Sequence, residues 1–374
     1  MFSEILNYLT IILLISYLIY FQRLNPSLGL TLIGLSSLPI FLVGAVVPMT
    51  LVSDSIQYTI FAQIYRAELF GLGSMPSAED IGTMSRHEGG TVDLIGFIYA
   101  LIPIPIIDNY KSIGFSNKFL FILMISFIYS HKIRRDNFLI IILIFYPSII
   151  FYSSVGLKDT LVLISMVFLA YYIIEKKILP IILTLYILYL LRNVNAFLLI
   201  PIISAYMIIF SKYKLPLKSL MILSASVFLL FFLYLKSDSL IELLNNYRLV
   251  RGKEDGLINL ILFKNIYDLI VNIFYLSYRF FFLPNLLTST SLFEAINSVE
   301  NIIISILLFY LFFKLFLFSK TKCLFWLLCL IFIAGIYGYV QSNVGSLVRY
   351  KFVFIAMYFT ILTYEIKYNR LKND

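Results

Sequence analysis

The residues of this chain that are best suited to chemistry are single basic side chains that interrupt its long apolar segments. Arginine stays protonated and offers a fork of donors to phosphate oxygens, and lysine adds a point charge. These breaks are expected to face outward, where the positive-inside rule disfavours basic residues. We therefore expect a site for an anionic group, such as the lipid-linked diphosphates of bacterial membranes. The six residues are Lys158, Arg192, Arg248, Arg251, Arg279 and Arg349.

Each of these cations has a second interpretation, in which the side chain only reaches the headgroups of the outer leaflet. For a single residue the two interpretations carry similar weight. The set as a whole favours a binding site, because three of its members lie at the ends of very short turns.

A carboxylate that takes up a proton is the second group such a site needs, and Asp54 is the first candidate. It opens a long outward region, where a general base can meet a substrate hydroxyl. The same residue is also well placed to cap a helix, with Gln57 three positions further on. The alternatives are Asp159, Glu254, Asp255, Glu294, Glu300 and His87. No spacing of His, Cys and Asp predicts a metal site. Arginine can neutralise an anionic group without a divalent cation, so we expect no required metal and no cofactor.

The composition places these residues in a membrane protein. Hydrophobic residues make up 61% of the 374 and charged residues only 13%, which is too little polar surface for a soluble domain of this size. The net charge of +9 fits cytoplasmic loops that face anionic headgroups. No basic run is long enough to follow a nucleic acid, so we expect no nucleic-acid partner. Cys323 and Cys329 share one apolar stretch, which argues against a disulfide framework.

Long apolar segments predict an all-α, polytopic integral membrane protein with about eleven transmembrane helices. Basic clusters near residues 131–135, 176–177, 212–218, 320–322 and 367–372 are the expected cytoplasmic anchors, with the N-terminus outside and the C-terminus inside. The alternative has twelve spans, both ends inside and residues 52–93 in the cytoplasm. The expected spans are Ile5–Phe21, Leu28–Leu51, Phe119–Ser130, Asn137–Ser154, Thr160–Ile174, Ile178–Leu191, Ala196–Phe210, Leu220–Leu235, Ile302–Phe318, Cys323–Val340 and Tyr350–Tyr364.

Two outward regions, at about residues 52–118 and 236–300, are expected to extend from a single membrane domain that comprises residues 1–374. In the first, Ser53–Phe70 is typical of an amphipathic helix, with Ile56, Ile60, Ile64 and Leu69 near one face. The region also holds seven acids against four bases, which are Arg66, Arg86, Lys111 and Lys118. This absence of a basic excess agrees with an outward location.

Two apolar segments in these regions are expected not to cross the membrane. Leu94–Ile107 is too short for a span, and Pro103 with Pro105 interrupts helical hydrogen bonding, so it favours a re-entrant or interfacial segment. Leu257–Leu287 is apolar and aromatic but is broken by charged residues. That pattern favours an interfacial helix against the outer leaflet.

Three short motifs in these segments carry a family resemblance. The first outward region opens at Val52 with Val-Ser-Asp-Ser-Ile-Gln-Tyr, residues 153–159 read Ser-Ser-Val-Gly-Leu-Lys-Asp, and residues 343–350 read Asn-Val-Gly-Ser-Leu-Val-Arg-Tyr. Together they resemble the bacterial oligosaccharide repeat-unit polymerases, the O-antigen polymerase (Wzy-type) group and related exopolysaccharide polymerases. Related polymerases often have Gly-Thr-Asp where this chain has Val52, Ser53 and Asp54. An Arg-Gln pair common in their later loop is replaced here by Lys158 and Asp159.

The resemblance implies a glycosyltransferase of the bacterial inner membrane with a fold similar to the GT-C type. Its substrates would be undecaprenyl diphosphate-linked oligosaccharides, and its partners the lipid bilayer and a polysaccharide chain-length regulator. The growing glycan would pass from its carrier to a sugar hydroxyl of the next repeat unit. The six cations would then bind the substrate and stabilise the leaving diphosphate, and Asp54 would be the catalytic base.

Two other functions stay open from the sequence. A lipid-linked oligosaccharide flippase or other transporter should carry charged residues near the middle of its spans. Here the expected spans are nearly uncharged, with Lys314 as the clear exception. A GT-C glycosyltransferase that uses a polyprenyl monophosphate sugar is barely distinguished from the first reading by sequence.

Overall fold

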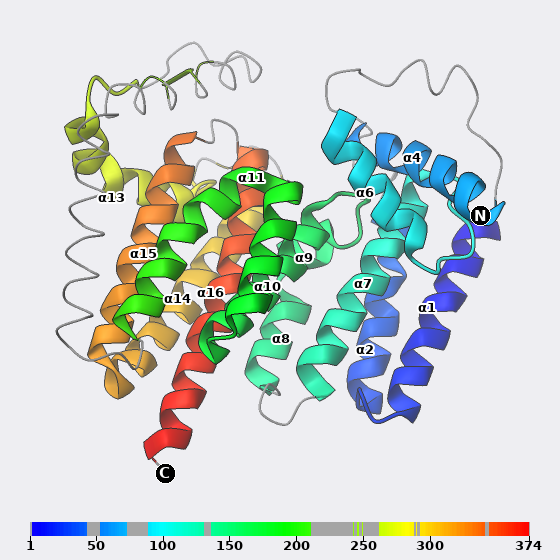
Figure 1. Cartoon of the computed structure of the whole chain (residues 1–374), viewed down its shortest axis with the longest axis horizontal. Coiled ribbons are helices and arrows are strands. Elements are labelled where there is room, and N and C mark those ends of the chain that lie inside the picture. The colour runs from blue at the N-terminus through cyan, green and yellow to red at the C-terminus, as the bar shows by residue number, and fades with distance from the viewer. Residues whose placement is uncertain are drawn as a thin grey trace. The chain divides into compact units, whose positions relative to one another are not determined.

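The computed structural model describes residues 2–42, 53–72, 89–130, 136–210, 242, 245, 246, 249, 262–287, 289, 292–340 and 344–373. Every regular element within these ranges is a helix, which confirms the expected all-α class (Figure 1). Contacts divide the chain into two compact units. The first consists of residues 1–167 with 190–192, and the second of residues 168–189 with 193–374.

Helix α7 is the centre of the first unit. It spans Tyr110–Ser130, and most of its residues are buried. Five helices pack on it: α1 (Phe2–Tyr20), α2 (Pro26–Ser36), α3 (Leu38–Leu42), α4 (Ser53–Phe70) and α8 (Asn137–Phe145). Helices α6 (Gly89–Leu101) and α9 (Pro147–Tyr152) and the first half of α10 (Asp159–Glu175) complete the unit. Figure 1 shows α4 lying steeply across the direction of α1 and α7, at the end that holds the N-terminus.

Local sequence explains where several of these helices begin. The side chain of Asn25 accepts a hydrogen bond from the amide of Leu28, and Pro26 occupies the first turn of α2. Asp136 caps α8 in the same way by accepting from the amide of Leu139. A proline at position 147 separates α8 from α9, so the expected span Asn137–Ser154 consists of two helices.

The second unit contains the long helices of the C-terminal half. They are α11 (Ile178–Ile209), α13 (Ile266–Phe282), α14 (Leu292–Phe318), α15 (Lys320–Val340) and α16 (Val344–Asn373). α13 crosses α15 at two glycines, because a Cβ on Gly335 would lie 2.4 Å from Ile273 and one on Gly338 would lie 1.9 Å from the carbonyl oxygen of Leu276. Small residues allow this close approach of two helix backbones. α14 packs against both α15 and α16.

Six helices within the described ranges are long and apolar enough to cross a membrane. This confirms a multi-pass membrane protein, while the total of eleven spans stays a prediction. The six stretches are Phe2–Tyr20, Tyr110–Ser130, Ile178–Ile209, Glu294–Phe318, Lys320–Tyr339 and Gly345–Arg370. Of the other expected spans, Leu220–Leu235 lies outside the described residues, and Thr160–Ile174 falls within α10.

Helix α4 has the predicted bounds, and of the four apolar residues predicted near one face, Ile60 is buried and Ile64 is partly buried. Ile56 and Leu69 are exposed, at 39% and 52%. Among the other buried positions, Tyr58, Ala62 and Arg66 recur every four residues and so share one face. That face is buried because α6 and α7 pack against α4. Hydrophobicity did not identify it, because the face includes an arginine.

The loop that follows α6 is held by side chains of other helices. α6 ends at Leu101, before both prolines, as predicted. The guanidinium of Arg66 donates to the carbonyl oxygens of Ala100, Ile102 and Pro105 at 3.2, 2.5 and 3.4 Å. Gln63 donates to Ile107, and Asn7 of α1 both donates to and accepts from the backbone of Ile106. Side chains thus satisfy an irregular backbone inside protein, as a re-entrant segment requires.

Candidate functional site

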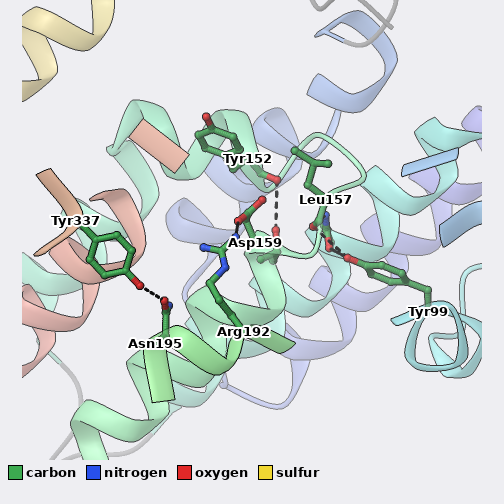
Figure 2. Close-up of polar contacts among 9 residues, drawn as sticks. Tyr99, Tyr152, Leu157, Asp159, Arg192, Asn195 and Tyr337 are labelled. Atoms are coloured by element: carbon green, nitrogen blue, oxygen red, sulfur yellow. Dashed lines mark hydrogen bonds and ion pairs between the residues drawn. The ribbon is translucent and has the colours of Figure 1, made fainter. Parts of the chain in front are cut away.

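The turn from Ser153 to Asp159, between α9 and α10, is the centre of a polar cluster in the first unit. Two side chains hold its backbone. The amide of Asn117 donates to the carbonyl oxygens of Val155 and Leu157 at 2.7 and 2.9 Å. The hydroxyl of Tyr99 donates to the Asn117 side-chain oxygen at 2.7 Å and lies 3.1 Å from the Leu157 oxygen, as Figure 2 shows. These groups are buried, so the turn has one well-defined conformation.

Two glycines bring this turn into contact with α7 and α4. A Cβ on Gly114 of α7 would lie 2.4 Å from the Ser154 carbonyl oxygen. A Cβ on Gly156 would lie 2.9 Å from the Cβ of Ser55. Ser55 follows Asp54 in the first turn of α4, and Gly156 comes two residues before Lys158. The predicted base and one predicted cation therefore belong to adjoining segments.

Asp54 itself is partly buried and is the second residue of α4, because the helix begins at Ser53. The interpretation of Asp54 as the helix cap stays a prediction, because the residues directly before α4 lie outside the described part of the chain. A carboxylate in the first helical turn is still favourable, since it meets the positive end of the helix dipole. Lys158 is also partly buried and lies directly before α10.

Arg192 forms a buried ion pair with Asp159 in the first unit. Its Nη2 lies 2.6 Å from Oδ1 of Asp159, and the two side chains are 7% and 0% exposed. Arg192 stands at a break inside α11, where its backbone is extended, with φ −160° and ψ 86°. The two expected spans on either side of it are thus separated where predicted. Figure 2 shows the guanidinium pointing to the carboxylate, and because the side chain is only 7% exposed, a role as a headgroup anchor does not fit Arg192.

Lys118 lies behind the same turn and was placed incorrectly by sequence. α7 begins at Tyr110 and not at Phe119, so Lys118 belongs to the helix and not to the preceding outward region. It is 2% exposed. Its ammonium donates to Oγ of Ser153 at 2.9 Å and to the carbonyl oxygen of Ile150 at 3.4 Å.

The second unit holds two further predicted cations, both partly buried. Arg279 is in the last turn of α13, and Arg349 is near the start of α16. A buried lysine, Lys351, links these helix ends to α14. Its ammonium donates to the Asn301 side chain at 2.6 Å and to the carbonyl oxygen of Leu283, directly after α13, at 3.0 Å.

Another buried polar contact in the second unit joins α11 to α15. The hydroxyl of Tyr337 donates to the side-chain oxygen of Asn195, as Figure 2 shows. The Nδ2 group of Asn195 is buried without a hydrogen-bond partner. Aromatic rings of Tyr350 and Phe354 lie 5.2 and 5.0 Å from the Tyr337 ring. The Nδ2 group of Asn195 is thus an unsatisfied donor close to a cluster of aromatic rings.

Some predicted site residues cannot be placed. Arg248 and Arg251, and the alternative bases His87, Glu254 and Asp255, lie outside the described residues. Of the remaining alternatives, Glu294 is partly buried in the first turn of α14 and Glu300 is buried further along it. Asp159 is paired with Arg192.

Comparisons with known proteins assign no family to this geometry. No protein-family model, no curated protein and no solved structure matches the chain. The family resemblance therefore remains a prediction, and function has to be inferred from the site itself.

Sequence reasoning missed several polar residues of these clusters, including Tyr99, Asn117, Lys118 and Lys351. The available signal was an ionisable or amide side chain inside an otherwise apolar segment. Such residues inside membrane helices are costly and usually functional. Asn117 and Lys118 are adjacent and precede an uninterrupted apolar run, and this signal was read as the end of a loop.

Proposed function

We propose that this protein is a glycosyltransferase that polymerises lipid-linked oligosaccharide repeat units at the outer face of the bacterial inner membrane. A sugar hydroxyl of the incoming repeat unit attacks the anomeric carbon of the growing glycan. The bond from that carbon to the undecaprenyl diphosphate oxygen breaks, and the hydroxyl proton passes to a base. The reaction needs a base and positive charge close together.

One observation supports the proposal: the first unit brings together three segments that are far apart in sequence and carry the required groups. Asp54 lies at the start of α4, Lys158 lies in the turn that contacts α4, and Arg192 is paired with the residue after Lys158. The carboxylate corresponds to the base that the reaction needs, and the two cations correspond to the positive charge that stabilises the leaving diphosphate. Clustering of this kind is unexpected for residues that serve only as headgroup anchors.

The roles in this proposal follow from burial. Lys158 is partly buried and supplies a point charge for a phosphate. Arg192 adds positive charge, and its ion pair with Asp159 keeps the guanidinium in place at the helix break. Asp54 accepts the proton. Arg248, Arg251, Arg279 and Arg349 complete the proposed substrate contacts, with a chain-length regulator as a further partner.

Deletion of the gene tests this proposal. Surface polysaccharide from the deletion strain should lose its ladder of lengths and collapse to single repeat units, and plasmid-borne protein should restore the ladder. An unchanged ladder would contradict the proposal. Total loss of the surface polysaccharide would identify the second candidate function instead.

That second candidate is a lipid-linked oligosaccharide flippase or another transporter, and one observation favours it. Lys118 and Lys351 are both 2% exposed inside helices that are long enough to span the membrane. Buried ionisable residues within spans are typical of transport pathways. Flipping precedes polymerisation, so its loss removes all repeat units from the outer face and leaves no single-unit product.

A further inference from the structure

Lys118 is a buried charge whose partners are all neutral. Its ammonium contacts Oγ of Ser153 and the carbonyl oxygen of Ile150. It also lies 5.9 Å from the centre of the Phe121 ring. None of these groups carries a negative charge that could offset the charge of a buried lysine.

The other buried charges of the described spanning helices have acidic or basic neighbours. Arg192 is paired with Asp159, and Glu365 is paired with Lys322 at 2.5 Å. Lys351 lies within the electrostatic influence of the buried carboxylate of Glu300. Lys118 alone among these described residues has no opposite charge nearby. Buried charges are normally paired, so an absent counter-charge requires an explanation.

Helix capping explains the position of the ammonium but not its charge. Ile150 and Ser153 are at the C-terminal end of α9, where carbonyl oxygens attract donors, and the Ile150 oxygen also accepts hydrogen bonds from Oγ of Ser154 and Oγ of Ser153. A neutral glutamine donates to the same oxygens without bringing a full charge into an apolar helix bundle. The charge itself is therefore the feature that needs a function.

We propose that Lys118 and Ser153 form a binding site for a phosphate group, and that a phosphate of the lipid-linked substrate supplies the missing counter-charge. This inference rests on the proposed function for the identity of that lipid. Both the lysine ammonium and the serine hydroxyl can donate to phosphate oxygens, the hydroxyl by giving up its 3.2 Å hydrogen bond to the Ile150 carbonyl oxygen. Both belong to the cluster that includes Lys158 and Arg192 in the first unit.

The weaker of the two ammonium contacts is the one that a ligand would replace. The longer of the two hydrogen bonds, at 3.4 Å, is the one to Ile150. The lysine has a flexible four-carbon stem, so in the proposed complex the ammonium exchanges this weak contact for a phosphate oxygen. Asn117 and Tyr99 meanwhile keep the turn in place.

Binding to the full-length protein in lipid nanodiscs tests the site, with undecaprenyl diphosphate and inorganic pyrophosphate as separate probes. Lys118→Gln retains the capping contacts and removes the charge. Because hydrogen bonds to charged groups contribute about 1.5–3 kcal/mol, this variant should bind the lipid at least tenfold more weakly than wild type. Lys118→Arg keeps the charge and should stay within about threefold of the wild-type affinity. Lys177→Gln is the control and should bind normally, because it removes one lysine charge at an exposed position outside the cluster.

The two probes distinguish the sources of the phosphate. If Lys118→Gln weakens the binding of undecaprenyl diphosphate and of pyrophosphate equally, the site recognises phosphate from any source. Weakening for the lipid alone, with no pyrophosphate binding in wild type, means that the phosphate must come from a lipid carrier. Normal lipid affinity in a folded Lys118→Gln variant overturns the proposal and leaves Lys118 as a helix cap.

A second variant covers the case in which Lys118→Gln does not fold. Ser153→Ala keeps the charge and removes one donor, so lipid binding should weaken about threefold to tenfold. Wild-type affinity in this variant, or no binding of either probe by the wild-type protein, also overturns the proposal. A normal polysaccharide ladder in the deletion strain would contradict the polymerase function without changing any of these binding results.

Discussion

Arg192 and Asp159 form a buried ion pair, 2.6 Å between Nη2 and Oδ1, that links a break in one helix to the first residue of another. The pair keeps the guanidinium in place beside the turn that contains Lys158. Removal of one partner leaves the other charge buried without compensation. Removing one partner or both partners of the pair can therefore distinguish a structural role of Arg192 from a role in the reaction.

Arg192→Ala should lower both the stability of the protein and the polymer yield. Breaking a buried ion pair costs about 3–5 kcal/mol, because the remaining charge is uncompensated. The double variant Arg192→Met with Asp159→Asn removes both charges and should recover most of that stability, measured by thermal unfolding in detergent. It should not recover polymer. A double variant that is stable and also makes a normal ladder would show that Arg192 has only a structural role.

Asp54→Asn should abolish polymer while the protein remains folded. Asparagine keeps most of the hydrogen bonding near the start of α4, and it removes the basicity of the carboxylate. Gln57→Ala, one turn further along the same helix, is the control and should leave the ladder intact. A near-normal ladder from Asp54→Asn would exclude Asp54 as the base and direct attention to Glu254, Asp255 and His87.

The hydrogen bond between Tyr65 of α4 and Asp93 of α6 should make the free energy of unfolding decrease at alkaline pH. The hydroxyl of Tyr65 donates to Asp93 at 2.6 Å, and this hydrogen bond, with burial and the nearby carboxylates, raises the pKa of Tyr65 to about 12. A tyrosine with a raised pKa stabilises the fold fully below its ordinary value near 10, and the stabilisation is lost as the pH rises from 10 to 12.

Tyr65→Phe measures that contribution directly. The difference in unfolding free energy between wild type and variant should be constant below pH 10 and should shrink between pH 10 and 12. Tyr267→Phe, at a position 70% exposed, controls for general effects of tyrosine ionisation. A difference that does not change over this pH range would contradict the hydrogen bond to Asp93.

Reporter fusions should place residues near 176 and 321 in the cytoplasm and residues near 156 and 193 outside. The fusion near residue 75 distinguishes eleven spans from twelve, and it should report an outward location. The hydrogen bonds that hold the loop after α6 support this outcome, because they fit a segment that enters the protein and returns. A cytoplasmic signal near 156 or 193 would place Lys158 and Arg192 on the wrong side for an outward substrate.

Much of the local structure could be predicted from the sequence, because it depends on neighbours in the chain. The apolar segments predicted a helical membrane protein, and α4 has the predicted bounds Ser53–Phe70. α6 ends before Pro103 and Pro105 because proline cannot continue the helical hydrogen bonds. The break near Arg192 was also expected, from a polar interruption between two apolar runs.

Only the tertiary structure determined which faces are buried and which charges meet. Arg66 of α4 is buried because carbonyl oxygens at the end of α6 and in the loop after it, more than thirty residues away, accept its hydrogen bonds. Arg192 finds Asp159 across 33 positions of sequence, and Lys118 finds Ser153 across 35. Composition and periodicity report the average environment of a helix, whereas these partners depend on how the helices pack. The class of the protein was therefore readable from local sequence, and the arrangement of its site was set by long-range packing.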